Sequence, residues 1–240
     1  MLRIVVMNAK GGSGKTTVAT NLASYCAAQA RGTQLFDYDA QASSSHWLKV
    51  RPDTVHVIHG VEAFKAPEPG ITRSWQLRVL PGTEYVIKDT PAGTSGIGVV
   101  EHVQRADIIL IPVLPSAIDI HSTANFIRDL LLRGKARTLN KHIGIIANRT
   151  RVGTRSLRAL ERFLRNLDIP VIAHLRDTQN YLRAAERGLG VCDLPDAAAR
   201  QDQPSWQAIL EWVQQFEAPS APSPSAEPAL SAAPRSGWVF

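Results

Sequence analysis

A glycine-rich segment near the start of the chain has the residue types that bind a nucleoside triphosphate. It reads Lys10-Gly11-Gly12-Ser13-Gly14-Lys15-Thr16-Thr17. Glycines allow backbone N–H groups to close around phosphates, and this spacing places Lys15 to reach the β- and γ-phosphates and the Thr16 hydroxyl to bind Mg²⁺. We therefore predict that the segment from Gly11 to Thr17 binds a nucleotide.

The elements on either side of this segment suit that chemistry. Residues 2–7 form an apolar run that predicts a buried strand, and residues 18–30 are rich in alanine and predict a helix. A helix that follows such a loop directs its positive N-terminal end and its unpaired N–H groups at the phosphates. Strand, loop and helix thus occur in the order that phosphate binding requires.

Two more segments carry aspartates at the expected ends of apolar strands. The first, residues 34–43, contains Asp37, Asp39 and Gln41, and the second, residues 85–93, contains Asp89. An aspartate at the carboxyl end of a strand faces the ligand crevice of an α/β sheet. Taken alone, Asp89 could instead cap the turn that follows it.

Together these three segments resemble the ParA/MinD partition ATPases. KGGSGKTT resembles the deviant Walker A motif of that family, residues 34–43 its first switch, and residues 85–93 its Walker B strand and second switch. The match is to small members without an N-terminal DNA-binding domain. The resemblance implies ATP and Mg²⁺ as cofactors and an ATP-bound homodimer. A metabolic ATP-dependent carboxylate-activating synthetase of the same fold, or a binding module with a silent site, are the alternatives.

The resemblance also assigns roles to individual residues. It implies that Lys10 crosses the dimer interface to the partner's nucleotide, where the alternative is a solvated lysine. It makes Asp39 the residue that orients the attacking water. The metal set is then Thr16, Asp37 and Asp89.

The sequence departs from the family pattern at three positions. Ala40 replaces the usual proline and Ala42 the usual glycine of the first switch, and we expect these changes to affect loop stiffness more than chemistry. Lys88 occupies a position where the family has an apolar residue. Since a buried unpaired ammonium is costly, we expect the Lys88 side chain to reach solvent or to pair with a carboxylate.

Later strands supply candidates for the base pocket. The apolar run 143–147 ends at Asn148, and family members use such an asparagine to hydrogen-bond the adenine; ordinary turn chemistry is the alternative. The segment Leu175-Arg176-Asp177 follows a later strand and is a second candidate wall of the pocket, with Arg176 as its candidate binding residue.

A basic region between residues 128 and 165 predicts a DNA-binding surface. Residues 154–168 read as a helix with an apolar stripe, and its arginines lie about 160° away around a 3.6-residue turn. Arginines that neutralise phosphates bind DNA without reading its sequence, as family members bind the nucleoid in the ATP state; a solvated helix face is the alternative. The candidate DNA contacts are Arg151, Arg155, Arg158, Arg162 and Arg165.

Composition sets the domain organisation. The chain has 240 residues with 44% hydrophobic content and a net charge of +6, and its alternating strands and helices predict one α/β P-loop NTPase domain, residues 1–217, with a mostly parallel sheet flanked by helices on both faces. Residues 218–240 are rich in Ala, Pro and Ser and predict a disordered tail. Two cysteines, Cys26 and Cys192, lack metal-ligand spacing.

No apolar run is long enough to span a membrane, and the first strand leaves no room for a signal peptide. We therefore expect a cytoplasmic, nucleoid-associated ATPase that does not bind membranes. The resemblance further implies that a ParB-like or other adaptor stimulates ATP hydrolysis and releases the dimer from DNA. The cargo could be a plasmid, a chromosome, a chemotaxis cluster or a carboxysome.

Overall fold

The computed structural model describes residues 1–217, and the predicted tail, with the terminal residues 238–240, lies outside the described residues. Helices and strands alternate along the chain. The strands are β1 (Leu2–Val6), β2 (Thr33–Asp37), β3 (His59–Glu62), β4 (Tyr85–Asp89), β5 (Ile108–Val113), β6 (His142–Thr150) and β7 (Val171–Arg176). The α-helices are α1 (Lys15–Ala28), α2 (Ser43–Lys49), α3 (Arg73–Gln76), α4 (Ile97–Gln104), α5 (Ala117–Leu132), α6 (Arg155–Arg165), α7 (Asn180–Ala185), α8 (Ala197–Arg200) and α9 (Gln203–Gln214), and Val191–Asp193 forms a short 3₁₀ helix.

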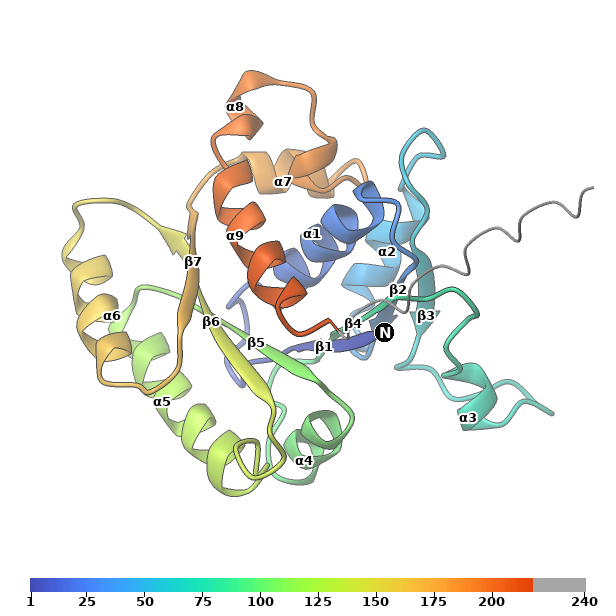
Figure 1. Cartoon of the computed structure of the whole chain (residues 1–240), viewed down its shortest axis with the longest axis horizontal. Coiled ribbons are helices and arrows are strands. Elements are labelled where there is room, and N and C mark those ends of the chain that lie inside the picture. The colour runs from blue at the N-terminus through green and yellow to red at the C-terminus, as the bar shows by residue number, and fades with distance from the viewer. Residues whose placement is uncertain (218–240) are drawn as a thin grey trace, which may run out of the picture.

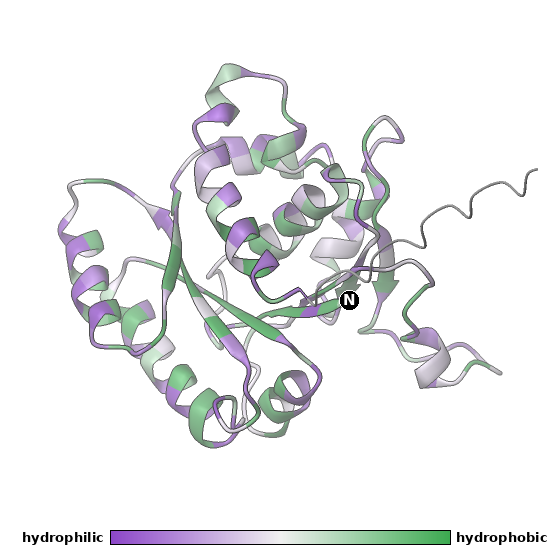
Figure 2. Ribbon diagram, viewed as in Figure 1, coloured by the Kyte–Doolittle hydropathy of each residue, from purple (hydrophilic) through white to green (hydrophobic). Residues whose placement is uncertain are grey.

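The seven described strands form one parallel sheet in the order β3-β2-β4-β1-β5-β6-β7. Every residue of β2, β4 and β5 is buried, because helices cover both faces of a parallel sheet. Figure 2 shows this as hydrophobic residues along the central strands, with hydrophilic residues on the outer helices. The predicted α/β P-loop fold is confirmed.

Two groups of helices enclose the sheet (Figure 1). Helices α1, α2 and α9 pack on one face, where Val18 and Leu22 of α1 belong to a large apolar core with Ile4, Leu35 and Ile87. Helices α4, α5 and α6 cover the other face over a second core around Val5 and Ile111. Cys26 is buried in the first core as a free thiol, and Cys192 is a half-buried one.

The bounds of two helices differ from the prediction for local reasons. Helix α1 begins at Lys15 rather than residue 18, because Gly14 takes a left-handed conformation (φ 94°) and turns the chain directly into the helix. Helix α6 is shorter than the predicted 154–168, since Thr154 is its N-cap and accepts a hydrogen bond from the Leu157 N–H, and Asn166 ends it.

None of the helices within residues 1–217 has the length and apolar character needed to cross a membrane.

Candidate nucleotide site

The sheet brings the predicted motifs together at the carboxyl ends of three neighbouring strands. Asp89 ends β4 and pairs in register with Val6 of β1 on one side and with Asp37 of β2 on the other. The glycine-rich loop follows β1 directly and leads into α1. A parallel sheet places ligands at this edge, so the fold assembles the three segments in one place.

The glycine-rich loop is held tightly against strand β6. The Asn148 side chain donates a hydrogen bond to the Ser13 carbonyl (2.9 Å), and a Cβ atom on Gly14 would lie 2.0 Å from Asn148 Nδ2. The Ser13 hydroxyl is buried and has no hydrogen-bond partner among residues 1–217. A loop with this close packing admits only glycine at position 14.

Lys15 is buried at the start of α1. Its ammonium donates to the carbonyl of Lys10 at 3.2 Å. Burial lowers the pKa of Lys15, and the nearby carboxylates of Asp89 and Asp39 oppose that shift. The Lys15 ammonium is therefore desolvated and lies near two acidic groups. A phosphate bound beside it would raise its pKa and favour the charged form.

Asp37 holds the backbone of the first-switch segment, residues 34–43, in place through hydrogen bonds. Asp37 Oδ2 accepts hydrogen bonds from the backbone N–H of Ser45 (2.9 Å) and from the Ser45 hydroxyl (2.8 Å), while Oδ1 accepts the Asp39 N–H (3.0 Å). The Asp39 carboxylate then accepts the Gln41 N–H at 3.0 Å. Both oxygens of Asp37 thus hold the loop that carries Asp39.

Ala42, at the end of this loop, has a left-handed backbone (φ 57°) and precedes helix α2. Left-handed geometry costs a residue with a Cβ about 1–2 kcal/mol. Alanine at position 42, where the family pattern has glycine, therefore adds backbone strain. The sequence predicted only a change in loop stiffness.

Asp89 is the most perturbed acid of the site. Its Oδ2 accepts a hydrogen bond from the Ser44 hydroxyl at 2.5 Å, whereas its buried Oδ1 has no hydrogen-bond partner among the described residues. Burial raises the pKa of Asp89 to about 6, although the hydrogen bond from Ser44 and the neighbouring Thr16 hydroxyl act in the opposite direction. A buried carboxylate oxygen without a partner, next to a threonine hydroxyl, is the donor set that Mg²⁺ takes together with phosphate oxygens.

Within residues 1–217 no cluster of three or more His, Cys, Asp or Glu side chains could hold a metal by itself. A Mg²⁺ ion at this site would therefore depend on the phosphates of the nucleotide for part of its coordination. This fits Mg²⁺, which is usually held by one or two carboxylates plus substrate phosphates.

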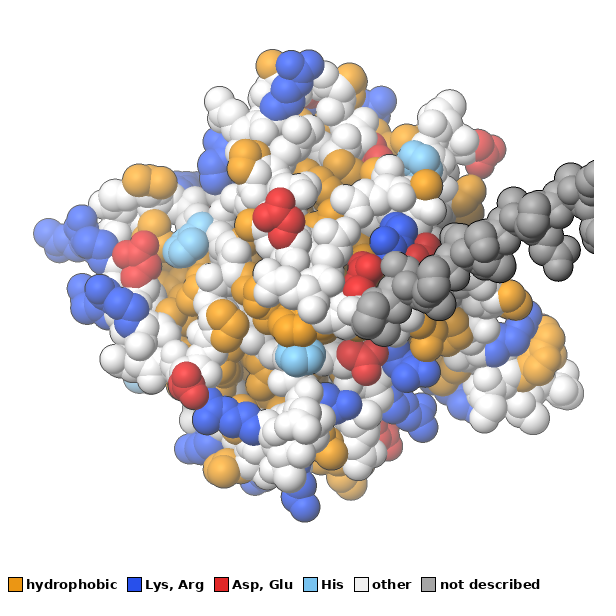
Figure 3. All heavy atoms as spheres, in the orientation of Figure 1, with side chains coloured by type: hydrophobic (Ala, Val, Ile, Leu, Met, Phe, Trp, Pro, Cys, Tyr) orange, Lys and Arg blue, Asp and Glu red, His pale blue; other side chains and the backbone are white. Residues whose placement is uncertain are grey.

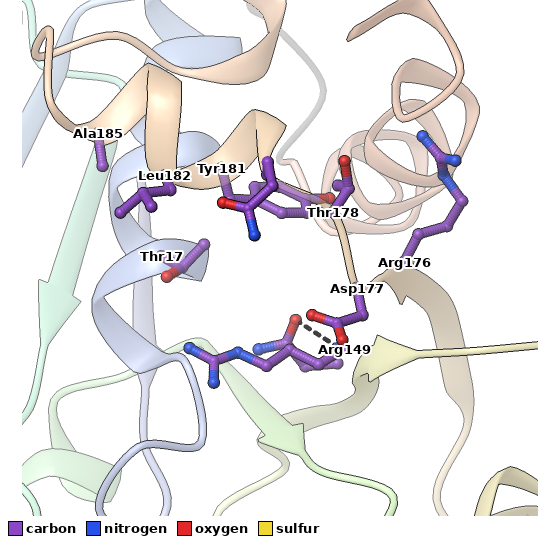
Figure 4. Close-up of a pocket in the computed structure, with 10 residues that line it drawn as sticks. Thr17, Arg149, Arg176, Asp177, Thr178, Tyr181, Leu182 and Ala185 are labelled. Carbon is purple, nitrogen blue, oxygen red and sulfur yellow. Dashed lines mark hydrogen bonds between the residues drawn. The ribbon is translucent and has the colours of Figure 1, made fainter. Parts of the chain in front are cut away.

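A cavity of about 340 Å³ opens beside the glycine-rich loop (Figure 4). It lies between α1, the end of β6, and the segment from the end of β7 into α7. Its lining consists of Thr17, Asn148, Arg149, Arg176, Asp177, Thr178, Gln179, Tyr181, Leu182 and Ala185. The size and position suit the base and sugar of a nucleotide whose phosphates rest on the loop.

Asn148 and Arg176 both border this cavity, but their side chains bond to other groups of the protein. Asn148 is 3% exposed, bonds to Ser13 as described, and accepts the Arg149 N–H at 2.9 Å. The Arg176 side chain points away from the cavity in Figure 4 and pairs with Asp202 at 2.9 Å. Arg176 and Asp177 line the cavity, as predicted for this segment, but the Arg176 guanidinium is engaged by Asp202, and its contact with a nucleotide stays a prediction.

Residues of α7 form the wall that sequence reasoning missed. Tyr181, Leu182 and Ala185 face Thr17 across the cavity in Figure 4. Helix α7 has six residues and no clear apolar period, so its sequence gave no signal of its role. Ser44, the partner of Asp89, was missed because it lies just beyond the segment that resembles the first switch.

The predicted basic helix face is present. Leu157, Leu160 and Leu164 of α6 are buried, and Leu167 after the helix is half-buried. Four arginines on the outer side are exposed and form no ion pair with any residue in the described part of the chain: Arg155, Arg158, Arg162 and Arg165. We call these four residues the α6 arginine face; Figure 3 shows Lys and Arg side chains projecting at the left, where α6 lies.

Two further basic residues differ from the α6 arginine face. Arg151 lies outside α6 and pairs with Asp177 at 2.5 Å, although its side chain is 73% exposed, and its contact with DNA stays a prediction. Lys88 is 6% exposed and forms no ion pair with an acidic side chain of residues 1–217, so the expected carboxylate partner is absent there. Its side chain lines a cavity that opens to solvent, in line with the other expectation for this residue. Burial, reinforced by Arg105 and Arg3, lowers the pKa of Lys88 to about 8.

Known proteins are similar to this chain in sequence and in fold. A family model described as the CobQ/CobB/MinD/ParA nucleotide binding domain matches residues 4–191. The maintenance of carboxysome distribution protein A of Gloeobacter kilaueensis is 31% identical over 212 residues, which cover 87% of this chain and 92% of the relative.

Two solved structures share the fold. One is an aspartate-to-alanine variant of McdA from Cyanothece in complex with ATP, with a TM-score of 0.66 at 18% identity, covering 89% of this chain and 96% of the other. The second is the septum site-determining protein MinD from Pyrococcus horikoshii, complexed with Mg-ADP, with a TM-score of 0.64 at 17% identity and coverage of 89% and 96%.

Proposed function

Because the chain belongs to the CobQ/CobB/MinD/ParA nucleotide-binding family, we propose that it is a Mg²⁺-dependent ATPase that positions a cellular cargo. One observation carries this proposal: the carboxyl ends of β1, β2 and β4 gather Lys15, Asp39 and Asp89 around the glycine-rich loop. The solved structures of the fold that contain ATP or Mg-ADP support the choice of ligand.

The chemistry assigned to the site follows from these positions. Thr16 and Asp89 would hold the metal, and Asp37, which fixes the loop, would add its charge to the metal set. Mg²⁺ would neutralise charge that develops on the phosphoryl oxygens. Lys15, with Lys10 from the partner subunit, stabilises the same charge, and Asp39 orients the attacking water. The loop from Gly11 to Thr17 binds the phosphates through its backbone.

Exposed apolar side chains around the site support the proposal that the protein forms a homodimer. Four large apolar side chains are exposed on segments that follow the carboxyl ends of strands, the edge at which the nucleotide would bind: Ile97, Ile118, Val152 and Leu182. Exposed apolar residues gathered at one edge are typical of an interaction surface. A partner seated there would cover them and bring its Lys10 to the nucleotide.

DNA binding is the second part of the proposal. The α6 arginine face is uncompensated within the described residues, and such a surface binds the DNA backbone without sequence specificity. We propose that the ATP-bound dimer binds nonspecific double-stranded DNA of the nucleoid and that an adaptor, ParB-like or of another type, stimulates hydrolysis and release.

The relatives favour a particular cargo. The family description names CobQ and CobB beside MinD and ParA, whereas a relative that this chain matches over 92% of its length is a carboxysome distribution protein. A second such protein, from Halothiobacillus neapolitanus, is 26% identical over 198 residues. We therefore place carboxysome positioning ahead of plasmid partition or a synthetase activity.

The ATPase assignment is tested by three substitutions. Lys15→Ala should abolish ATP binding, because it removes the buried ammonium of the loop. Asp39→Ala should retain ATP binding but lose roughly 10²-fold or more in hydrolysis. The matched control is Asp53→Ala, an exposed aspartate outside the site, which should hydrolyse ATP like the wild type. Turnover by Asp39→Ala at the wild-type rate would contradict the role of Asp39.

A further inference from the structure

Lys88 lies on the face of the sheet that is turned away from α1. In the sheet register it is flanked by Val5 of β1 and Phe36 of β2. Val5 belongs to the apolar core under α4 and α5, and Phe36 to a small cluster with Val86 and Ala63. The lysine thus interrupts an otherwise apolar layer between two clusters, on the opposite face from the glycine-rich loop.

Lys88 lines a cavity of about 380 Å³. Two more cations, Arg3 and Arg105, lie on its wall, and Phe36, Tyr38 and Leu77 form much of its apolar side. The acid whose charge acts on Lys88 is Asp107, and its carboxylate already accepts the backbone N–H of Arg3 at 2.8 Å. None of the three cations forms an ion pair with an acidic side chain of residues 1–217, and no hydrogen bond reaches the Lys88 ammonium from that part of the chain.

A cationic group that is 6% exposed and lacks a partner costs free energy unless something compensates its charge. The walls around it combine that charge with aromatic surface. Small-molecule sites have this character: mostly apolar walls with a few polar groups that fix the orientation of the ligand.

We propose that this cavity is a second ligand site that binds a small organic anion. Its phosphate or carboxylate group meets Lys88, Arg3 and Arg105, and its planar or apolar part lies against Phe36 and Tyr38. Phosphates and carboxylates share the acceptor geometry that guanidinium groups recognise. The site is separate from the nucleotide site but adjoins it through the backbone, because Lys88 directly precedes Asp89.

Isothermal titration calorimetry with phenyl phosphate and with benzoate tests the proposal. Wild-type protein should bind at least one of these probes with a millimolar or lower Kd. Lys88→Met and Arg105→Gln should each weaken binding roughly tenfold or more, because each removes a charge-assisted contact. Lys88→Met places an apolar side chain in an apolar layer and should fold, and Arg105 is exposed, so neither result depends on a disrupted core.

Two control variants locate the binding. Lys49→Met removes an exposed lysine elsewhere and should leave probe affinity unchanged. Lys15→Ala should also retain probe binding, since the glycine-rich loop lies on the other face. The proposal is overturned if neither probe binds the wild type, or if Lys15→Ala abolishes binding while Lys88→Met and Arg105→Gln retain it.

Discussion

At the scale of single residues, the clearest departure from expectation is the backbone of Ala42. Its φ of 57° is a conformation that glycine adopts at little cost. Ala42→Gly should therefore raise the free energy of unfolding by about 0.5–1 kcal/mol, after the greater entropy loss of glycine is included. Urea unfolding of the nucleotide-free protein measures the change.

The matched control for Ala42→Gly is Ala40→Gly in the same loop. Ala40 does not have a positive φ, so glycine there gains nothing from relief of strain and should lower stability or leave it unchanged. Equal stabilisation by both substitutions would contradict the account of Ala42.

His102 on α4 gives a pH dependence of stability. Burial, together with the charges of Lys88 and Arg105, lowers the pKa of His102 to about 4, and its ring meets Tyr38 edge-on at 5.0 Å. Between that value and about 6.5, the unfolded chain binds the proton and the folded protein does not. Stability that His102 contributes above pH 6.5 is therefore lost as the pH falls towards 4.

Replacing His102 by glutamine should make the fall in unfolding free energy between pH 7 and pH 5 smaller by about 1–2 kcal/mol. Denaturant unfolding at several pH values measures this slope. His121→Gln, at an exposed histidine, should keep the wild-type slope. If His102→Gln kept the wild-type slope of unfolding free energy against pH, His102 would have the same pKa in the folded and unfolded states, contrary to this account.

At the scale of elements, Asn148 joins strand β6 to the glycine-rich loop. Asn148→Ala leaves the Ser13 carbonyl and the Arg149 N–H without that partner, so we expect a loss of about 1–3 kcal/mol in the stability of the nucleotide-free protein. If Asn148 served the base alone, stability would be unchanged and only the preference for ATP over GTP would fall. Thermal unfolding and competition binding separate the two roles.

Element type was predictable from sequence where the pattern was long. The apolar runs of β1, β4 and β6 and the arginine-leucine pattern of α6 were identified correctly. Strand β3 and helix α3 were not predicted, because each has four residues and neither has the apolar period that marks a longer element. Strand β3 is positioned by its pairing with β2, and helix α3 by hydrogen bonds from Arg73 to the carbonyls of Ala63 and Lys65, which no local pattern encodes.

The nucleotide site was predictable to a similar degree. Motif spacing predicts Lys15, Asp37 and Asp89 as site residues, and the register of the strands places the two aspartates side by side. The direction of the Arg176 side chain was not predictable, because its partner Asp202 is 26 residues away in sequence. The unpaired state of Lys88 likewise results from which side chains surround it in the fold.

At the scale of the whole molecule, the nucleotide site and the α6 arginine face lie at different places on one sheet. The first is at the carboxyl ends of β1, β2 and β4, and the second is carried by the helix that connects β6 to the edge strand β7. In the proposed function, the bound nucleotide would control DNA binding through dimer formation, which would double the number of arginines presented to one DNA molecule. The proposed function therefore depends most directly on DNA binding that requires ATP.

The most direct test is binding to nonspecific double-stranded DNA with ATP, with ADP and without nucleotide, across a salt series. The account predicts binding that requires ATP and weakens with salt. Arg158→Glu/Arg162→Glu removes two arginines from each subunit of the dimer and should reduce the slope of log affinity against log salt by about 4. Lys49→Glu/Arg78→Glu, at exposed positions near the opposite edge of the sheet, should leave the slope unchanged. Binding that is equal with and without ATP, or unaffected by the α6 substitutions, would contradict it.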